Sequence, residues 1–293
     1  MPGSSAQTDR KHLFFIILAF AAVYVIWGTT YLAIRLAIET IPPFLMAGSR
    51  FLVAGAFIFT IMRLRGAPLP QRLHWRSAVI IGALLMLGGS GMLTWSEQQV
   101  PSSTAALVVA TMPLWMALFD WLIFKGSRPG KRVTFGLFLG LIGIILLIGP
   151  GQFSGTAGFS LFFLLILMLS PINWSLGSLY SRDADLPDNI FMAIAMEMLA
   201  GGALLLLAAL LTGELSRLDV AAISTRSLAA TAYLAVFGSI IGFTAYIWLL
   251  KYVPATKVAT YTYVNPVIAV FLGWLILDEA VTSTTIAAVV VIV

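Results

Sequence analysis

The stretch from Trp95 to Pro101, WSEQQVP, together with Pro113 and Trp121, decides the fold because its pattern occurs twice in the chain. The frame W-x5-P-x11-P-x7-W returns without a gap 153 residues later, at Trp248, Pro254, Pro266 and Trp274. Upstream, at an offset of 147, three further residues recur: Trp27, Arg35 and Gly55 match Trp174, Arg182 and Gly202. Agreement of scarce residue types at nearly constant spacing indicates an internal duplication.

The duplicated sequence is that of a membrane protein. The chain is 60% hydrophobic and 10% charged, with a mean hydropathy of +1.00, whereas a soluble domain has roughly 25% charged residues. Long apolar runs can each cross the ~30 Å hydrocarbon layer. They predict ten helices, over approximately 13–35, 43–63, 76–98, 102–124, 132–150, 157–180, 189–212, 227–250, 255–277 and from 281 onward. Only fourteen residues follow Glu279, so we expect the last helix to be truncated here.

The helices divide into two repeats of five, over 13–150 and 157–293. Because five is odd, the second copy must enter the bilayer from the opposite side, which predicts an all-α membrane protein of two inverted repeats. Inverted repeats are typical of transporters whose substrate site lies at the repeat interface near mid-membrane. The alternative is a duplicated scaffold, as in some channels and intramembrane enzymes.

Charge predicts the orientation rather than a ligand. Thirteen of the seventeen Lys and Arg residues fall on one side of the ten helices. The positive-inside rule then places both termini in the cytoplasm, so the net charge of +5 gives no reason to expect nucleic-acid binding. The chain has no Cys, which excludes disulfides and thiolate metal sites. A cleaved signal peptide is disfavoured because the first apolar run is too long.

Several short motifs carry a family resemblance. They are Tyr24–Tyr31 (YVIWGTTY), Arg50-Phe51, Pro101 with Thr104–Leu107, Pro113, Pro254-Ala255, Asn265-Pro266 and Leu277-Asp278-Glu279. Together they make the chain resemble the ten-helix drug/metabolite transporters of the EamA type, and particularly the YddG-like amino-acid exporters. The resemblance implies two five-helix bundles around a central cavity and efflux of small metabolites, without fixing the substrate.

Two charged residues, Arg50 and Glu197, lie deep inside the predicted spans, whereas Glu97 and Asp120 lie near helix ends. Arg50 stands seven residues past Pro43, hence ~10 Å below the outer surface, and charges at such depth normally face a bundle interior or an aqueous cavity. Its repeat equivalent is Glu197, a similar ~10 Å from the cytoplasmic surface, so the two are not expected to pair. Arg50 could meet a substrate carboxylate or a gate residue, or be satisfied by helix-end carbonyls. Glu197 is the best candidate for proton coupling. The alternative is that the protein is an uncoupled facilitator.

Aromatic, amide and hydroxyl side chains are predicted to line the cavity with Arg50. Pairs spaced by four residues share a helix face, and an apolar cavity with few polar groups suits amphipathic solutes. The alternative for each ring is an interfacial belt. The remaining candidate cavity residues are Trp27, Tyr31, Ser90, Thr94, Asn173, Trp174, Thr244, Trp248, Tyr261 and Asn265.

Pro113 and Pro266 are predicted inside helices, where proline removes a backbone hydrogen bond and favours a kink. They are candidate hinges for alternating access, or sites of fixed shape complementarity. A G-x-x-x-G at Gly136 and Gly140 permits close helix packing, which we expect to be intramolecular, in a monomer.

The sequence therefore predicts a secondary transporter of the cell inner membrane that exports amino acids or related metabolites by alternating access. The chain shows no P-loop and no H-E-x-x-H motif, so we expect neither ATP-driven pumping nor a metal or other cofactor, and no enzymatic activity. The alternatives are a broad drug carrier, a nucleotide-sugar carrier, a channel or an intramembrane enzyme.

Overall fold

The computed structural model describes residues 3–131, 135–136, 139, 142 and 161–292. Within them, eight helical spans are long and apolar enough to cross a membrane. They are His12–Ala37, Pro43–Leu64, Arg72–Ser96, Ser102–Leu122, Leu161–Asp183, Ile190–Leu211, Thr225–Tyr252 and Ala255–Leu277. These match the predicted helices one to four and six to nine. The predicted helix 132–150 lies almost wholly outside the described residues.

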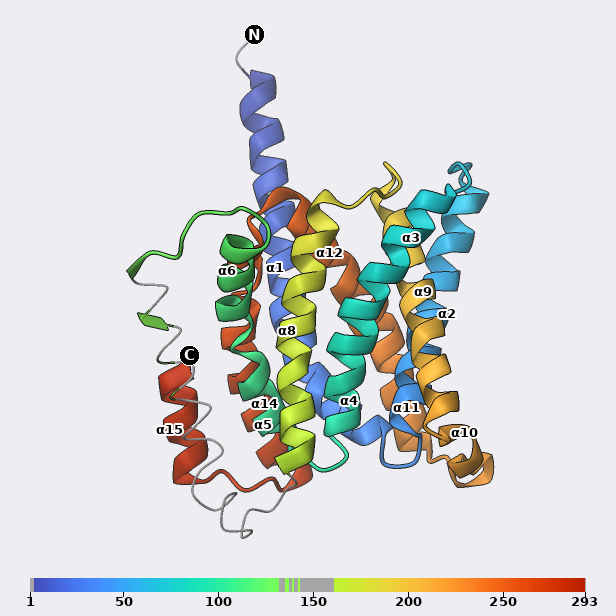
Figure 1. Cartoon of the computed structure of the whole chain (residues 1–293), viewed down its shortest axis with the longest axis vertical. Coiled ribbons are helices and arrows are strands. Elements are labelled where there is room, and N and C mark those ends of the chain that lie inside the picture. Colours follow the sequence, from blue (N-terminus) through green and yellow to red (C-terminus); the bar gives the residue numbers. More distant parts are fainter. Residues whose placement is uncertain (1–2, 132–134, 137–138, 140–141, 143–160, 293) are drawn as a thin grey trace.

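The described helices form one bundle (Figure 1). Helices dominate because only structures that satisfy their own backbone hydrogen bonds can cross hydrocarbon. In chain order the elements are α1 (Gly3–Ala37), α2 (Pro43–Leu64), α3 (Arg72–Ile81), η1 (Gly82–Gly91), α4 (Met92–Ser96), α5 (Ser102–Val109), α6 (Met112–Leu122), α8 (Leu161–Asp183), α9 (Ile190–Leu211), α10 (Glu214–Arg217), η2 (Val220–Ala222), α11 (Thr225–Tyr233), η3 (Leu234–Phe243), α12 (Thr244–Tyr252), α13 (Ala255–Val258), α14 (Tyr261–Leu277) and α15 (Ser283–Ile292).

The duplication is visible in the backbone. Lys125 and Asp278, 153 positions apart, both have a positive φ, of 56° and 53°, a conformation uncommon for residues other than glycine. The two π-helical segments also correspond, because η1 and η3 are each ten residues long and lie 152 positions apart. Neither feature was predicted from the sequence. The first recurs at the 153-residue offset of the Trp and Pro frame, and the second recurs within one residue of it.

The equivalent helices α2 and α9 pack directly against each other. A Cβ added to Gly202 would lie 2.9 Å from the backbone nitrogen of Leu52 and 3.1 Å from the carbonyl oxygen of Gly48. Its repeat equivalent, Gly55, would meet the backbone of Ala195 at 3.0 Å. The absence of side chains at these positions lets the two backbones approach closely, as is common between membrane helices.

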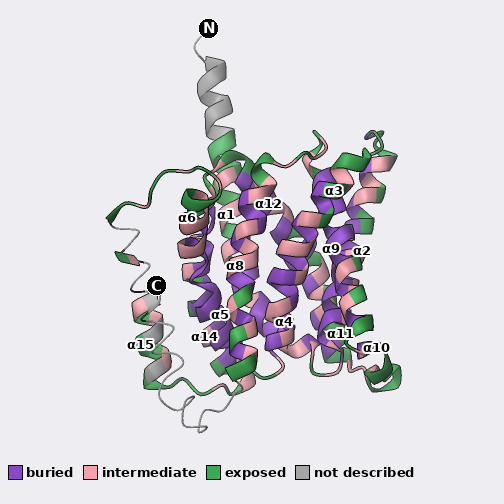
Figure 2. Cartoon of the chain, viewed as in Figure 1, coloured by how far each residue is buried: buried purple, intermediate pink, exposed green. Residues whose placement is uncertain are grey.

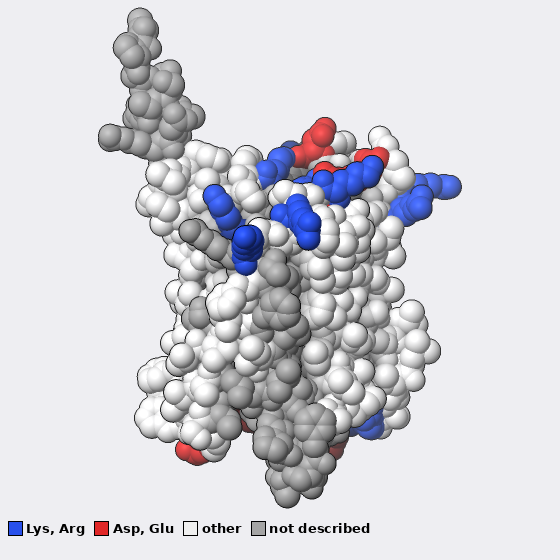
Figure 3. All heavy atoms as spheres, turned by 60° about the vertical axis from the view of Figure 1, so that its left-hand side comes forward, with Lys and Arg blue, Asp and Glu red and all other residues white. Residues whose placement is uncertain are grey.

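The surface separates apolar sides from polar ends. Figure 2 shows buried residues concentrated between the helices, and many exposed hydrophobic side chains point outward, among them Phe57, Leu165 and Phe271. Figure 3 shows Lys and Arg gathered around the end that is uppermost in Figure 1, which we call the basic end. The other end, where α1 finishes and α2 begins, is called the far end (Figure 1).

The fourth and ninth spans are interrupted rather than continuous. The fourth breaks at Ala110 and Thr111 between α5 and α6, so Pro113 is the second residue of α6 rather than an interior one. The ninth breaks at Ala259 and Thr260, between α13 and α14. Pro266 lies inside α14, as predicted. The expected equivalence of the two prolines within their helices was therefore wrong.

Candidate functional site

A small central cavity lies where the two repeats meet. Its free volume is about 70 Å³, room for about two waters at ~30 Å³ each. Seven of the predicted cavity residues line it: Trp27, Tyr31, Arg50, Ser90, Trp174, Tyr261 and Asn265. Gly238 and Phe243 of η3 also contribute, as Ser90 of η1 does. Both π-helical segments thus reach the cavity, and such segments occur frequently at functional sites.

Arg50 supplies the fixed positive charge of the cavity. Its side chain is buried on α2, and its Nη2 donates a hydrogen bond of 2.6 Å to the Ser90 hydroxyl. The guanidinium lies over the ring of Phe51, 4.6 Å from its centroid, within cation–π range. Its Nε has no hydrogen-bond partner among the described residues. A buried cation with a spare donor can bind an anionic group of a ligand.

Four rings form an aromatic cluster at the cavity, and three of them, Trp27, Trp174 and Tyr261, line it. The Trp27 ring centroid lies 5.4 Å from that of Trp174, 5.0 Å from Tyr246 and 4.9 Å from Tyr261. Trp27 is fixed by a hydrogen bond of 3.1 Å from its Nε1 to the carbonyl of Gly238. The Tyr246 hydroxyl is 2.6 Å from that of Ser178. These contacts join α1, α8, α12 and α14 around a largely apolar, polarisable surface.

Two polar groups of the wall lack a hydrogen bond of good geometry. The amide nitrogen and oxygen of Asn265 and the Nε1 of Trp174 are buried and make none in the described part of the chain, although the amide interacts with the side chain of Tyr31 and the indole with that of Tyr246. Such groups are normally paired in proteins, so unpaired ones call for an explanation. Together with Arg50, they give the cavity three donors and one acceptor for a polar ligand.

The other predicted cavity residues lie outside this lining. Thr94 is buried one turn beyond Ser90, and its hydroxyl, like that of Thr244, has no partner among the described residues. Asn173 donates to the Leu169 carbonyl of its own helix at 2.8 Å. Trp248 packs against His12 and Tyr252, with ring centroids 5.8 and 4.7 Å away.

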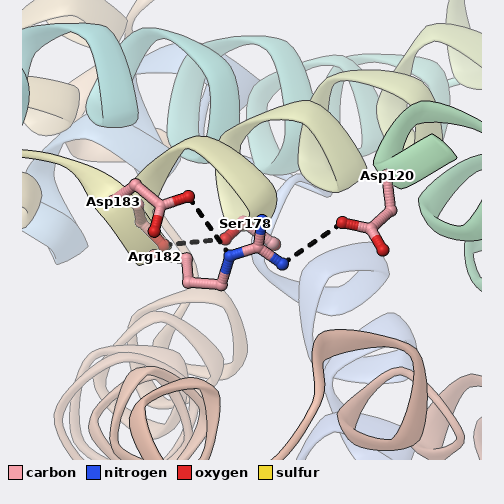
Figure 4. Close-up of polar contacts among 5 residues, drawn as sticks. Asp120, Ser178, Arg182 and Asp183 are labelled. Carbon is pink, nitrogen blue, oxygen red and sulfur yellow. Dashed lines mark hydrogen bonds and ion pairs between the residues drawn. The ribbon is translucent and has the colours of Figure 1, made fainter. Parts of the chain in front are cut away.

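A second cavity of about 450 Å³ opens toward the basic end. Glu197 lines it, buried, with neither carboxylate oxygen partnered among the described residues, and Arg182 and Lys251 lie in the same lining. Figure 4 shows Arg182 between two acids, where it makes ion pairs of 3.2 Å with Asp120 and 3.3 Å with Asp183. The Arg182–Asp120 pair connects α8 to α6 at the mouth of this end.

A third cavity, of about 650 Å³, lies at the far end. Arg35, the repeat equivalent of Arg182, lines it together with Gln98, Gln99 and Glu279. The Glu279 carboxylate accepts four hydrogen bonds, from the backbone N–H and the hydroxyl of both Ser102 and Ser103. It thereby caps the first turn of α5.

Sequence reasoning missed the acids of the far end. Glu279 belongs to the quoted motif Leu277-Asp278-Glu279, yet its capping role depends on how α14 meets α5. Glu97 was placed near a helix end and set aside, but its side chain is 0% exposed. Arg35 donates a hydrogen bond to the backbone carbonyl of Glu97. The one sequence signal that could have drawn attention to Glu97 is its position between Trp95 and Pro101 of the repeated frame.

Comparison with known proteins identifies the family. The model of the EamA-like transporter family matches residues 13–149 and again residues 159–293. The chain belongs to the EamA-like transporter family. The same family model thus matches the chain twice, once in each half.

Relatives in this family bear transporter names. The chain is 42% identical over 257 residues to the "Uncharacterized inner membrane transporter YedA" of Escherichia coli K12, covering 87% of this chain and 80% of the relative. It is 26% identical to the "Uncharacterized transporter YoaV" of Bacillus subtilis, covering 91% and 90%. A solved crystal structure 22% identical to this chain shares the fold, with a TM-score of 0.68 over 95% of this chain and 94% of that one. The protein is accordingly a multi-pass membrane transporter and not an enzyme.

Proposed function

We propose that this EamA-family transporter exports amino acids or related small amphipathic metabolites across the cell inner membrane by alternating access. The working unit is a monomer of ten helices, in which two inverted five-helix repeats move about the central cavity. The basic end faces the cytoplasm, with both termini on that side, in accord with the positive-inside rule. The observation that carries the proposal is Arg50, a buried arginine with a free donor, facing a ring-lined cavity between the repeats.

The course of the helices supports inverted repeats. In Figure 1, α1 runs away from the basic end while its equivalent α8 runs toward it. The same reversal holds for α2 and α9, which lie side by side. An arrangement of this kind brings equivalent elements together at mid-membrane, where inverted-repeat transporters bind their substrates.

The chemistry of the cavity supports a substrate with an anionic group and an apolar body. The guanidinium of Arg50 matches a carboxylate, and the free amide of Asn265 can bind a second polar group. The Trp27, Trp174 and Tyr261 rings then cover the apolar body of the substrate. A nucleotide-sugar carrier would concentrate several cations in its cavity, whereas Arg50 is the one Lys or Arg in this lining.

The sizes of the three cavities support a rearrangement of the central walls during transport. The central cavity of about 70 Å³ lies between larger cavities of about 450 and 650 Å³ toward the two ends. Small-molecule sites generally measure ~300–1,000 Å³, so the central walls must separate before a metabolite can bind. The interrupted spans, at Ala110–Thr111 and Ala259–Thr260, allow parts of two lining helices to move separately.

Counterflow in proteoliposomes tests the proposal. The full chain is reconstituted, loaded with unlabelled solute and offered a panel of labelled amino acids, a labelled nucleotide sugar and a lipophilic cationic drug. We expect saturable counterflow of one or more amino acids and loss of at least tenfold in Arg50→Ala, measured against Arg217→Ala, an exposed arginine outside the cavity. Flux of the nucleotide sugar or drug alone would overturn the substrate class, and steady ohmic current in a planar bilayer would indicate a channel.

A further inference from the structure

Glu97 is a buried acid near the far end of the protein, and its carboxylate has no hydrogen-bond partner among the described residues. It follows directly after α4, one residue beyond the span Arg72–Ser96, and its side chain is 0% exposed. Neither carboxylate oxygen has a hydrogen-bond partner among the described residues. Thr94 and Ser96, just before it, also carry buried hydroxyls without partners in that part of the chain. Three polar side chains within four residues are thus buried without a hydrogen bond among the described residues.

Charged and titratable groups from three parts of the fold lie around this acid. Tyr31 and Arg35 of α1 and Arg50 of α2 interact with it electrostatically, as does Glu279 after α14. Arg35 is near enough to bind the backbone carbonyl of Glu97, yet it leaves the side chain unpaired. Arg50 is held by Ser90 instead. Two arginines therefore adjoin a carboxyl group that neither one binds.

The arrangement fits a neutral carboxylic acid. An ionised carboxylate taken out of water without hydrogen bonds costs several kcal/mol, which a nearby arginine would relieve by pairing with it. Burial and the charge of Glu279 raise the pKa of Glu97 well above its ordinary value, against the opposing effect of Arg35 and Arg50. A proton on Glu97 explains why both guanidinium groups are engaged elsewhere.

We propose that Glu97 is a proton-binding residue between the central cavity and the far end, and that its ionised form competes with the anionic group of the substrate for Arg50. The second half of this inference rests on the proposed function. When Glu97 loses its proton to solvent water, no other bond is broken, and the new carboxylate attracts Arg50 away from Ser90. When Glu97 regains the proton, Arg50 returns to the cavity and is available to the substrate.

Proton and substrate then favour each other's binding. Linkage is reciprocal, so if protonation of Glu97 raises substrate affinity, bound substrate retains the proton on Glu97. Above the titration of Glu97, the half-saturating substrate concentration rises by about tenfold per pH unit for a single linked proton. This assigns to Glu97 the proton chemistry that the sequence suggested for Glu197.

Infrared difference spectroscopy tests the proton site without any substrate. Spectra of the reconstituted full chain, recorded between acid and alkaline pH, should show a protonated carboxyl band that disappears in Glu97→Gln and remains in Glu197→Gln, which removes an equally buried acid. In Arg50→Gln, the loss of the neighbouring cation should shift the titration of this band to higher pH. A band unaffected by Glu97→Gln overturns the proton site, and a titration unaffected by Arg50→Gln overturns the competition. Size-exclusion profiles verify that each variant is folded.

Counterflow of labelled L-phenylalanine as a function of pH tests the link to transport. The half-saturating concentration should rise with pH in the wild type and in Glu197→Gln, and be independent of pH in Glu97→Gln. Glu97→Asp should restore the dependence. The same slope in Glu97→Gln as in the wild type overturns the competition. If L-phenylalanine gives no flux in any variant, the amino-acid part of the proposed function fails with this probe, while the infrared titration still decides the proton site.

Discussion

Ser103 donates two hydrogen bonds to Glu279: the carboxylate Oε2 of Glu279 lies 2.6 Å from the Ser103 hydroxyl and 3.1 Å from the Ser103 backbone nitrogen. Its other oxygen binds Ser102 in the same way. A single side chain thus joins the end of α14 to the start of α5, two helices that line the central cavity. The repeat equivalent of Glu279 is Gly126, so the basic end has no matching carboxylate at that position. The contact that Glu279 makes at the far end therefore has no counterpart at the equivalent position of the basic end.

The first prediction is that Glu279→Ala lowers the free energy of unfolding by about 2–3 kcal/mol, because hydrogen bonds to a charged group contribute ~1.5–3 kcal/mol each and are not additive. Thermal unfolding in detergent measures the change. Asp278→Asn is the matched control, since it removes the neighbouring charge at a residue whose positive φ asparagine tolerates. Equal shifts in the two variants would show that charge, rather than capping, is responsible.

The second prediction concerns the contact between α2 and α9. Gly202→Ala should destabilise the protein by about 1–3 kcal/mol, because the new methyl group meets backbone atoms of Leu52 and Gly48 at about 3 Å and the helices must separate. Gly130→Ala places the same methyl group where no other described residue lies within 4 Å. Unfolding in detergent compares them, and an unchanged midpoint in Gly202→Ala would mean that the two helices pack less closely than described.

The third prediction separates two indoles in one wall. Trp27→Phe leaves the carbonyl of Gly238 without its donor and should cost about 1–3 kcal/mol of stability. Trp174→Phe removes the same ring area but an N–H that has no partner among the described residues, so it should cost about 1 kcal/mol less than Trp27→Phe. If the free N–H binds substrate, Trp174→Phe raises the half-saturating concentration several-fold in counterflow. A stability loss in Trp174→Phe as large as in Trp27→Phe would contradict this distinction.

The sequence predicted the spans and the repeat because apolar runs and scarce Trp and Pro residues record them directly. It also placed seven of eleven candidate residues in the cavity lining, since helical spacing defines a face. Spacing does not define how deep in the membrane a residue lies. Trp248 is four residues from Thr244 and was expected on the same cavity-facing side, but it packs against His12. The helix break at Ala259 and Thr260 contains no glycine or proline, so the sequence did not predict it. Glu97 becomes buried only when Arg35 and Glu279 arrive from distant parts of the chain.

The last prediction treats the two inner prolines as unequal. Pro113 is the second residue of α6, where an N–H would have no intrahelical acceptor, so proline costs little there. Pro266 lies inside α14, where it denies a hydrogen bond to the carbonyl of Thr262. We therefore expect Pro266→Ala to restore that bond, raise the unfolding temperature and slow counterflow by several-fold, because α14 carries Tyr261 and Asn265 into the cavity and becomes stiffer. Pro113→Ala should alter both quantities little. Equal slowing by both substitutions would favour two equivalent hinges, whereas no slowing by Pro266→Ala would mean that the proline shapes α14 without moving it.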